Sequence, residues 1–364
     1  MNEQVFQIAL TRIKGLGPIR QKRLLDHFID ASGIFNASSN ALREPEGIGE
    51  LAFRAIESFK GFTAIEKELE LLSDKNIETH FYTDESYPNR LRFCVDAPIL
   101  LYTVGKMNFN KQRFVGIVGT RKASNYGKRM VRKLLEELSS LNITLVSGLA
   151  YGIDINAHRT ALDYDMQNIA VLAHGLQRVY PTEHRECLKQ MTANGGAITE
   201  YSYGVIPNRE NFPERNRIIA GLCDALVLVE SKKKGGAMIT AELADSYNRD
   251  VFAVPGKTED TLSRGCNFLI KRQKAHMLED PQDLIRKMNW IPSSKKKKVQ
   301  KQLFVPMGKN EEKIVSFLSE QGTSHLEEIA QRIKLNSTQI AMHLLELEIN
   351  GVIRSMPGSI YALC

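Results

Sequence analysis

The sequence predicts an α/β protein whose central part is a doubly wound, mostly parallel, Rossmann-like sheet. Three observations support this fold class. Short apolar runs alternate with helical patterns between about 110 and 290, helices with glycine-containing turns precede them, and three helices and a hairpin close the chain. A chain of 364 residues has room for two or three domains. The predicted domains cover residues 1–65, 66–290 and 309–364, with a linker at 291–308.

Residues 1–65 are predicted to form a helical domain of the helix-hairpin-helix or SAM-like kind. The segment 13–18 (IKGLGP) precedes an apolar helical pattern, and Gly47-Ile48-Gly49 stands before another helix. In helix-hairpin-helix domains such glycines let backbone N–H groups approach a phosphate at a helix N-terminus. Two interpretations stay open: a DNA contact, or two tight turns in a small helical domain.

Six apolar runs in the central domain are predicted to be buried parallel strands. They are rich in β-branched residues, and helical patterns separate them, as expected when parallel strands are joined by helices. The runs are Phe114–Val118, Thr144–Val146, Ile169–Leu172, Ala197–Thr199, Ala225–Val229 and Val251–Val254.

Residues 309–364 follow the pattern of a winged-helix domain. The third helix is expected from Ser337 to Asn350, with Gly351 as its cap, and the runs Val352–Ser355 and Ile360–Leu363 flank a Met-Pro-Gly turn. A winged helix normally places its third helix in the DNA major groove. This helix contains no Lys or Arg, so we expect a protein contact or a structural role instead of base readout.

The net charge of +7 is weak evidence for a nucleic-acid partner. Five of the positive charges belong to the linker lysines, which leaves about +2 for the rest of the chain. Such a charge run is usually a solvated segment, and an auxiliary phosphate contact is the alternative. The lysines are Lys295, Lys296, Lys297, Lys298 and Lys301.

No membrane segment or secretory signal is expected, because the sequence contains neither a run of eighteen apolar residues nor a basic, apolar N-terminus. The five cysteines show neither metal-ligand spacing nor a disulfide pattern, so most should be core residues. These features together predict a cytoplasmic protein.

The ends of the predicted strands predict an anion site. Ligands of open parallel sheets bind at the carboxyl ends of the strands. The first strand is followed by Gly119-Thr120-Arg121-Lys122, the second by Ser147-Gly148, and the fifth by Glu230 and then Lys232–Gly236. Backbone N–H groups of the glycines, together with Arg121, would bind phosphate. The alternative, glycines that only turn tight junctions, does not account for the cations at the same edge.

A second basic tract is expected to join this edge. It contains Arg209, Phe212, Arg215, Asn216 and Arg217, just before an apolar helix. A base can stack on an aromatic ring while arginines hold the flanking phosphates, which suits single-stranded nucleic acid. Two alternatives are a core position for Phe212 and internal ion pairs for some of the arginines. A further tract after the sixth strand contains Arg264, Lys271, Arg272 and Lys274.

The nucleotide-binding motifs that would indicate an enzyme are missing. The glycines from Gly119 to Gly127 have the wrong spacing for a P-loop, and no Gly-x-Gly-x-x-Gly follows a strand. The four acids at Asp154, Glu200, Glu230 and Glu242 do not have a spacing diagnostic of a metal site. We therefore expect no catalysis, no cofactor and no metal.

The central region resembles the DNA-processing protein A family (DprA, also called Smf). The resemblance extends in order over some 160 residues. It rests on Gly119-x-Arg121, the segment 147–154 (SGLAYGID), Tyr180-Pro181, the segment 212–222 (FPERNRIIAGL), Thr240-Ala241, the segment 254–256 (VPG) and Gly265-x-Asn267. The sequence departs from the family pattern at Gly235, Ala173 and Gln177, where Ser, Gly and Asp are usual.

This resemblance implies a function that composition alone does not. Family members bind and protect single-stranded DNA, help to load the RecA recombinase during natural transformation and recombination, and dimerise through the Rossmann-like domain. Of Arg215 and Arg217, one is expected to brace the loop and not to touch DNA. The predicted DNA-binding set is Gly119, Thr120, Arg121, Lys122, Ser147, Gly148, Arg209, Phe212, Arg215, Asn216, Arg217, Lys234, Gly235, Gly236, Thr240 and Asn267.

A second resemblance is to phosphoribohydrolases of the lysine-decarboxylase-like (LOG) group. Their motif is Pro-Gly-Gly-x-Gly-Thr-x-x-Glu, and this chain has Gly235-Gly236-Ala237-Met238-Ile239-Thr240-Ala241-Glu242. The third glycine is absent and the threonine is one place late. The similarity therefore indicates a related fold and not the same activity.

Overall fold

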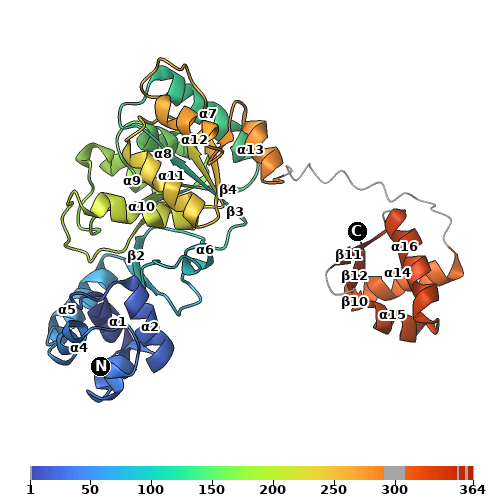
Figure 1. Cartoon of the computed structure of the whole chain (residues 1–364), viewed down its shortest axis with the longest axis horizontal. Helices are drawn as coiled ribbons and strands as arrows, with labels where there is room; N and C mark the ends of the chain where they lie inside the picture. Colours follow the sequence, from blue (N-terminus) through green and yellow to red (C-terminus); the bar gives the residue numbers. More distant parts are fainter. Residues whose placement is uncertain (1, 291–307, 351, 357–359, 364) are drawn as a thin grey trace. The chain divides into compact units, whose positions relative to one another are not determined.

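The six predicted strands lie within a single nine-stranded sheet in the computed structural model of the chain (Figure 1). The structure describes residues 2–290, 308–350, 352–356 and 360–363. It divides into two compact units, residues 1–292 and 293–364. The predicted linker lysines, the Gly351 cap and the Pro-Gly of the predicted hairpin turn lie outside the described residues.

The strand order is β1-β2-β6-β5-β4-β3-β7-β8-β9. Strands β3 to β9 pair in parallel, as predicted, whereas β1 and β2 add an antiparallel edge beside β6. The sequence prediction did not contain β1, β2 and β9. The strands are β1 (Glu78–Phe81), β2 (Leu100–Val104), β3 (Arg113–Val118), β4 (Ile143–Ser147), β5 (Gln167–Val171), β6 (Gly195–Thr199), β7 (Ala225–Leu228), β8 (Asp250–Ala253) and β9 (His276–Met277).

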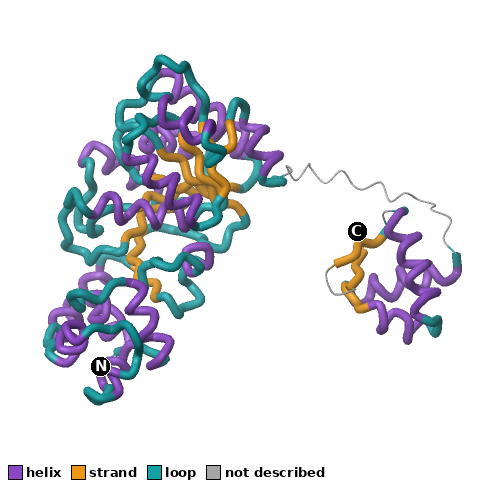
Figure 2. The backbone as a smooth tube through the Cα atoms, viewed as in Figure 1, coloured by secondary structure: helices purple, strands orange, loops and turns teal. Residues whose placement is uncertain are grey.

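Helices cover both faces of the sheet, and the alternation of side chains along the strands shows why (Figure 2). Phe114 and Val118 of β3 pack with α10, α11 and α12, whereas Val115 and Ile117 pack with α7, α8 and α13 on the other face. Helices α6 and α9 complete the layers. The helices are α6 (Asn89–Arg92), α7 (Asn125–Ser139), α8 (Ile153–Asp163), α9 (Arg185–Met191), α10 (Asn211–Leu222), α11 (Gly236–Ser246), α12 (Arg264–Lys271) and α13 (Pro281–Lys287), with a 3₁₀ turn, η2, at Thr182–His184.

The N-terminal helices form the expected glycine turns. Gly15 and Gly47 have φ of 78° and 77°, which glycine adopts without steric strain, and Gly17 and Gly49 directly precede α2 and α4. The helices are α1 (Glu3–Thr11), α2 (Pro18–Phe28), α3 (Ala31–Asn36), η1 (Ala41–Arg43), α4 (Glu50–Glu57) and α5 (Phe62–Asp74).

The proposed domain boundary at residue 65 falls inside α5. The helical core also continues into the sheet, because Phe81 of β1 and Leu100 and Tyr102 of β2 pack in the same cluster as α1 and α5. The edge strands therefore join the N-terminal helices to the sheet. β1 and β9 are short edge strands of four and two residues, which leave little apolar pattern in the sequence. β2 is an apolar, buried run as long as β4, and the sequence prediction missed it although its composition could have indicated a strand.

The C-terminal unit has the predicted helix-helix-helix-hairpin order, with one additional short strand. Its strands pair in the order β10-β12-β11. The third helix ends one residue before the predicted Asn350. The elements are α14 (Lys309–Gln321), β10 (Thr323–His325), α15 (Leu326–Ile333), α16 (Ser337–Ile349), β11 (Ile353–Met356) and β12 (Ile360–Leu363).

Cys94, Cys187, Cys223 and Cys266 are buried, as predicted, and Cys364 lies outside the described residues. Among the helices of the described residues, none is both long and apolar enough to span a membrane.

Candidate nucleic-acid interface

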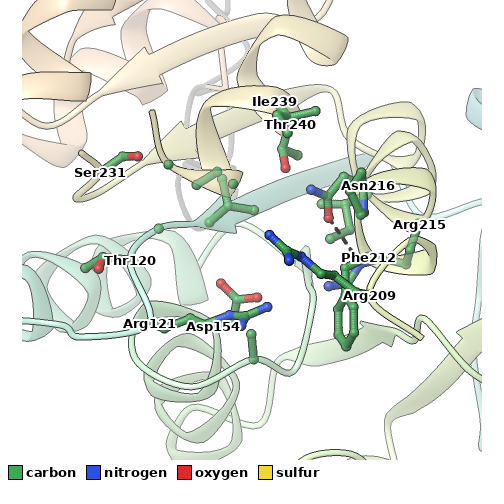
Figure 3. A pocket seen from close by; sticks show the side chains of 18 of the residues that line it. Thr120, Arg121, Asp154, Arg209, Phe212, Arg215, Asn216, Ser231, Ile239 and Thr240 are labelled. Carbon is green, nitrogen blue, oxygen red and sulfur yellow. Dashed lines mark hydrogen bonds between the residues drawn. The ribbon is translucent and has the colours of Figure 1, made fainter. Parts of the chain in front are cut away.

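A cavity of about 720 Å³ opens at the carboxyl edge of the sheet where β3 and β7 are neighbours (Figure 3). From β3 the chain proceeds through β4, β5 and β6 on one side, and from β7 through β8 and β9 on the other. The two strands therefore flank the topological switch point, where loops diverge and leave a crevice. Ligands of doubly wound folds bind at such points.

Most of the predicted residues meet in the wall of this cavity, although they come from three separate segments of the chain. The segment after β3, the start of α10 and the turn from β7 into α11 all contribute. Ten of the sixteen predicted residues line it: Gly119, Thr120, Arg121, Arg209, Phe212, Arg215, Asn216, Gly235, Gly236 and Thr240.

Three cations at the cavity carry the charge that a phosphate could reach. Arg121, Arg209 and Lys232 are all exposed, and within the described parts of the chain none of their side chains forms a hydrogen bond or an ion pair. Figure 3 shows the Arg209 side chain extending into the same space as that of Arg121. Unpaired cations converging on one cavity favour an anionic ligand.

The aromatic ring of Phe212 lies beside these cations. The guanidinium carbon of Arg121 is 5.6 Å from the ring centroid, within cation–π range. Phe212 is half-buried, so part of its ring is open to a ligand. The predicted combination of an aromatic surface with flanking arginines is therefore present at one site. Phe212 does not occupy a core position, because its ring is only half-buried.

The N-terminus of α11 adds backbone donors to the cavity. Gly235 caps this eleven-residue helix without any side-chain hydrogen bond, and Gly236 and Ala237 in the first turn line the cavity. The first N–H groups of a helix have no partner within it, and the helix dipole favours an anion there. A phosphate at this position would satisfy them.

Arg215 has a different environment from Arg121 and Arg209, since only 4% of it is exposed. Its Nη1 donates to the carbonyl of Gly148 at 2.8 Å and to that of Val171. Burial lowers the pKa of Arg215 to about 10, so the guanidinium stays charged at neutral pH. Burial also raises the pKa of Asp154, against the opposing effect of nearby Arg215. Arg215 therefore braces the loop after β4 from the cavity wall, and its contact with DNA stays a prediction.

Arg217 is also held by the protein. It forms an ion pair with Glu200 and donates to the carbonyl of Asp96. Its side chain is 12% exposed, and it does not line the cavity. One of Arg215 and Arg217 was predicted to brace the loop, whereas the structure gives both of them internal partners.

Three further predicted contacts are scaffold residues. Ser147 is fully buried and donates to the carbonyl of Ile117 at 2.6 Å. Gly148 is buried, and its N–H donates to Asp154 at 3.1 Å. The side-chain amide of Asn267 bonds to both backbone groups of Gly256, at 2.8 and 3.2 Å. These residues shape the loops around the cavity and do not line it, and their contact with DNA stays a prediction.

Lys122 and Lys234 are exposed and follow or precede lining residues in the sequence, but they do not line the cavity. Their contact with DNA stays a prediction. Conversely, Tyr180 lines the cavity and was not in the predicted set. Its ring centroid lies 6.0 Å from that of Phe212, edge to face, and it is 47% exposed. Its presence in the Tyr180-Pro181 motif was the available signal.

The four acids considered as a metal cluster have separate environments. Asp154 accepts from Gly148, Glu200 pairs with Arg217, and Glu230 accepts from the backbone N–H and hydroxyl of Ser124. Glu242 is exposed and does not line the cavity. They do not converge on one point that a cation could occupy.

The sequence also matches known protein families. Residues 78–289 match DNA recombination-mediator protein A, and residues 306–359 match the DprA winged-helix domain. The chain belongs to the DNA recombination-mediator protein A family. This confirms the family resemblance and the winged-helix prediction.

Relatives in this family extend over most of the chain. Protein Smf of Synechocystis is 33% identical, over 99% of this chain and 98% of its own length. DNA processing protein DprA of Streptococcus pneumoniae is 39% identical, over 56% of this chain and 71% of its own length. Its X-ray structure superposes with a TM-score of 0.65 at 30% identity, covering 79% of this chain and 98% of that one.

The structure of DNA processing protein A from Helicobacter pylori is also similar. It has a TM-score of 0.54 and 28% identity, and it covers 60% of this chain and 97% of its own. The description of that structure concerns how the Helicobacter pylori protein binds single-stranded DNA.

Proposed function

We propose that this chain binds and protects single-stranded DNA through its phosphate backbone at the β3–β7 cavity, and that it helps to load RecA onto that DNA. The setting would be DNA uptake, natural transformation and recombination. The observation that carries the proposal is the convergence of three unpaired cations, an uncapped helix N-terminus and the open ring of Phe212 in one cavity. The single-stranded DNA binding described for the Helicobacter pylori relative supports it.

Single strands fit this site better than duplex DNA for a physical reason. In a duplex the bases are stacked inside, and an aromatic side chain cannot stack on them without opening the helix. In a single strand every base presents a free face that can stack on a ring while cations hold the neighbouring phosphates. The cavity offers both groups within a few ångströms, at Arg121 and Phe212.

The test is a mobility-shift comparison of single-stranded and double-stranded DNA of equal length across a range of salt concentrations. We expect a clear preference for single strands. With ~4 phosphates neutralised, the logarithm of affinity should fall with the logarithm of salt concentration with a slope of roughly −3. Equal or tighter binding of the duplex would contradict the proposal and favour a transcription-factor function.

The interaction with RecA, the homodimer through the Rossmann-like domain and the cytoplasmic location are also part of the proposal, on the strength of family membership. RecA loading predicts faster nucleation of RecA on single-stranded DNA when this protein is present. A homodimer predicts twice the chain mass in sedimentation equilibrium. An unchanged rate of RecA nucleation would contradict the proposed RecA loading. A monomer in sedimentation equilibrium would contradict the proposed homodimer.

We further propose that the protein is not an enzyme. The carboxylates near the cavity are engaged with protein groups and not with open space, as for Glu230 with Ser124. Glu242, which would correspond to the motif glutamate of the LOG phosphoribohydrolases, does not line the cavity. Incubation of the purified protein with nucleoside monophosphates tests the alternative, because release of free base would show that activity.

A further inference from the structure

The third helix of the winged-helix unit, α16, is apolar on two faces. Ile340, Leu344 and Leu347 are buried in the core of the unit. Met342, Leu345 and Ile349 are 68%, 58% and 76% exposed. Single exposed apolar residues are common on protein surfaces, but three in a row along one helix form a stripe that indicates an interaction surface. We call these three residues the α16 seam.

The spacing of the α16 seam is that of a helix-pairing surface. Met342 and Leu345 are three residues apart, and Leu345 and Ile349 are four apart. This alternation places side chains on one line of a helix, at the a and d positions of a heptad, where they insert between the side chains of a second helix. The thirteen residues of α16 extend about 20 Å, enough for a short helix to lie alongside.

The charge around the α16 seam excludes DNA as its natural partner. The helix contains Glu346 and Glu348 and neither Lys nor Arg. From Lys309 to the end of the chain there are seven acidic and five basic residues, although the whole chain has a net charge of +7. A phosphate backbone would be repelled, and apolar side chains offer it no hydrogen bonds.

The acidic residues of α16 also indicate whether the partner of the α16 seam is a second copy of this chain or a different protein. Glu346 and Glu348 occupy the e and g positions that flank the seam, where side chains of paired helices meet. Glu346 is exposed, whereas Glu348 is half-buried and accepts hydrogen bonds from the backbone N–H and the hydroxyl of Ser355. Two copies of α16 would bring like charges together. A partner helix with Lys or Arg at its flanking positions gains attraction instead.

We propose that the α16 seam is a docking site for an amphipathic helix of another protein, with apolar residues at heptad spacing and basic residues beside them. The recognition helix of this winged-helix unit then binds protein in place of DNA. The proposal does not rest on the single-stranded DNA function, since the β3–β7 cavity belongs to the other compact unit.

The experiment uses the full-length protein and two fluorescently labelled designed peptides of 21 residues. Both have Ile at the a positions and Leu at the d positions. One has Lys at every e and g position, which also keeps it from pairing with itself, and the other has Glu there. In fluorescence anisotropy we expect micromolar binding of the Lys peptide and at least tenfold weaker binding of the Glu peptide. Equal binding of the two peptides, or no binding of either, would overturn the proposal.

Leu345→Ser tests the seam itself, and Leu51→Ser is the matched control. Leu51 lies on α4 and is 83% exposed. Removing one buried aliphatic contact should weaken binding of the Lys peptide about tenfold, whereas Leu51→Ser should leave it unchanged. Ile349→Ser is measured in parallel, so that a folding defect in one variant does not decide the result. Unchanged peptide affinity in both seam variants would contradict the proposal.

Two further measurements separate the other possible occupants. Concentration-dependent self-association that disappears in Leu345→Ser would assign the seam to a second copy and overturn the proposal. Loss of DNA affinity in Leu345→Ser would assign it to DNA and also overturn it. We expect single-stranded DNA affinity to be the same in Leu345→Ser and the unmodified protein. If Arg121→Ala and Phe212→Ala left DNA affinity unchanged, the proposed DNA-binding function would be contradicted. The proposal for the α16 seam would not be affected.

Discussion

The guanidinium carbon of Arg121 lies 5.6 Å from the ring centroid of Phe212, although the two residues are 91 positions apart in the sequence. Arg121 belongs to the loop after β3, and Phe212 to the first turn of α10. Their contact places a charge for a phosphate next to a surface for a base. The two residues should therefore contribute to DNA binding in ways that salt dependence can separate.

Arg121→Ala should weaken single-stranded DNA binding and change its salt dependence. Loss of one phosphate contact flattens the slope of log affinity against log salt by about 0.7 for a single strand. The measurement is fluorescence anisotropy at several salt concentrations. Lys189→Ala removes an exposed cation of α9 that does not line the cavity, and serves as the control. If a folded Arg121→Ala protein had unchanged single-stranded DNA affinity and an unchanged salt slope, the cavity would not be the DNA-binding site.

Phe212→Ala should weaken binding without changing the salt slope. Stacking of one base on an aromatic side chain contributes about 1–3 kcal/mol, which is roughly a 5- to 150-fold change in affinity, and it releases no counterion. Phe93 is 87% exposed and does not line the cavity, so Phe93→Ala is the matched control. If Phe212→Ala also flattened the slope, the ring would act mainly by holding Arg121 in place.

Arg215→Ala should reduce the stability of the fold, whereas Arg209→Ala should reduce DNA affinity at unchanged stability. Removing the buried guanidinium leaves Asp154 without its nearby positive charge and the carbonyls of Gly148 and Val171 without a donor. Leaving a buried polar group without its hydrogen-bond partner costs about 1–3 kcal/mol. Urea unfolding measures the first effect and anisotropy the second. Equal stability of the two variants would show that Arg215 does not brace the loop.

Stability should fall in mild acid because of His158. This side chain is fully buried, its ring nitrogens contact Asn168 and the N–H of Leu149, and burial lowers its pKa from 6.5 to about 4. In the unfolded chain the His158 imidazole therefore becomes protonated below about pH 6.5. In the folded chain it becomes protonated only near pH 4. The free energy of unfolding should decrease across that window by up to roughly 3 kcal/mol.

Urea unfolding of the protein and of His158→Gln between pH 7.5 and pH 4.5 measures this effect. Glutamine keeps a donor and an acceptor but does not titrate, so the variant should lose less stability on acidification. Parallel pH profiles of the two proteins would contradict the assignment to His158.

Ending the chain after Trp290 should leave single-stranded DNA affinity nearly unchanged. The residues that line the cavity all precede this position, and the sequence from Lys309 onward carries more acid than base. We expect a change within about twofold, because phosphate contacts dominate affinity and few are lost. A large loss in anisotropy would assign a main DNA contact to the lysine-rich linker or the winged-helix unit.

The central strands and the location of the site could be predicted from the sequence. The six apolar runs are buried strands because a sheet covered by helices on both faces requires continuous apolar residues. The loops after β3 and β7 meet because parallel strands share a carboxyl edge. The antiparallel pairing of β1 and β2 at the edge could not be predicted in this way, because it depends on contacts with β6 and with the N-terminal helices.

The sequence by itself determined which residue types gather at the carboxyl edge of the sheet, because strand and helix patterns are local properties of the chain and parallel strands end at the same edge. Only the tertiary structure decided which arginines are free. Arg209, Arg215 and Arg217 lie in one short tract, yet one is exposed and the other two are held by distant partners. The carbonyls of Gly148 and Val171, the carboxylate of Glu200 and the carbonyl of Asp96 reach them through the fold. A charge keeps its capacity to bind a ligand only where folding brings it no internal partner.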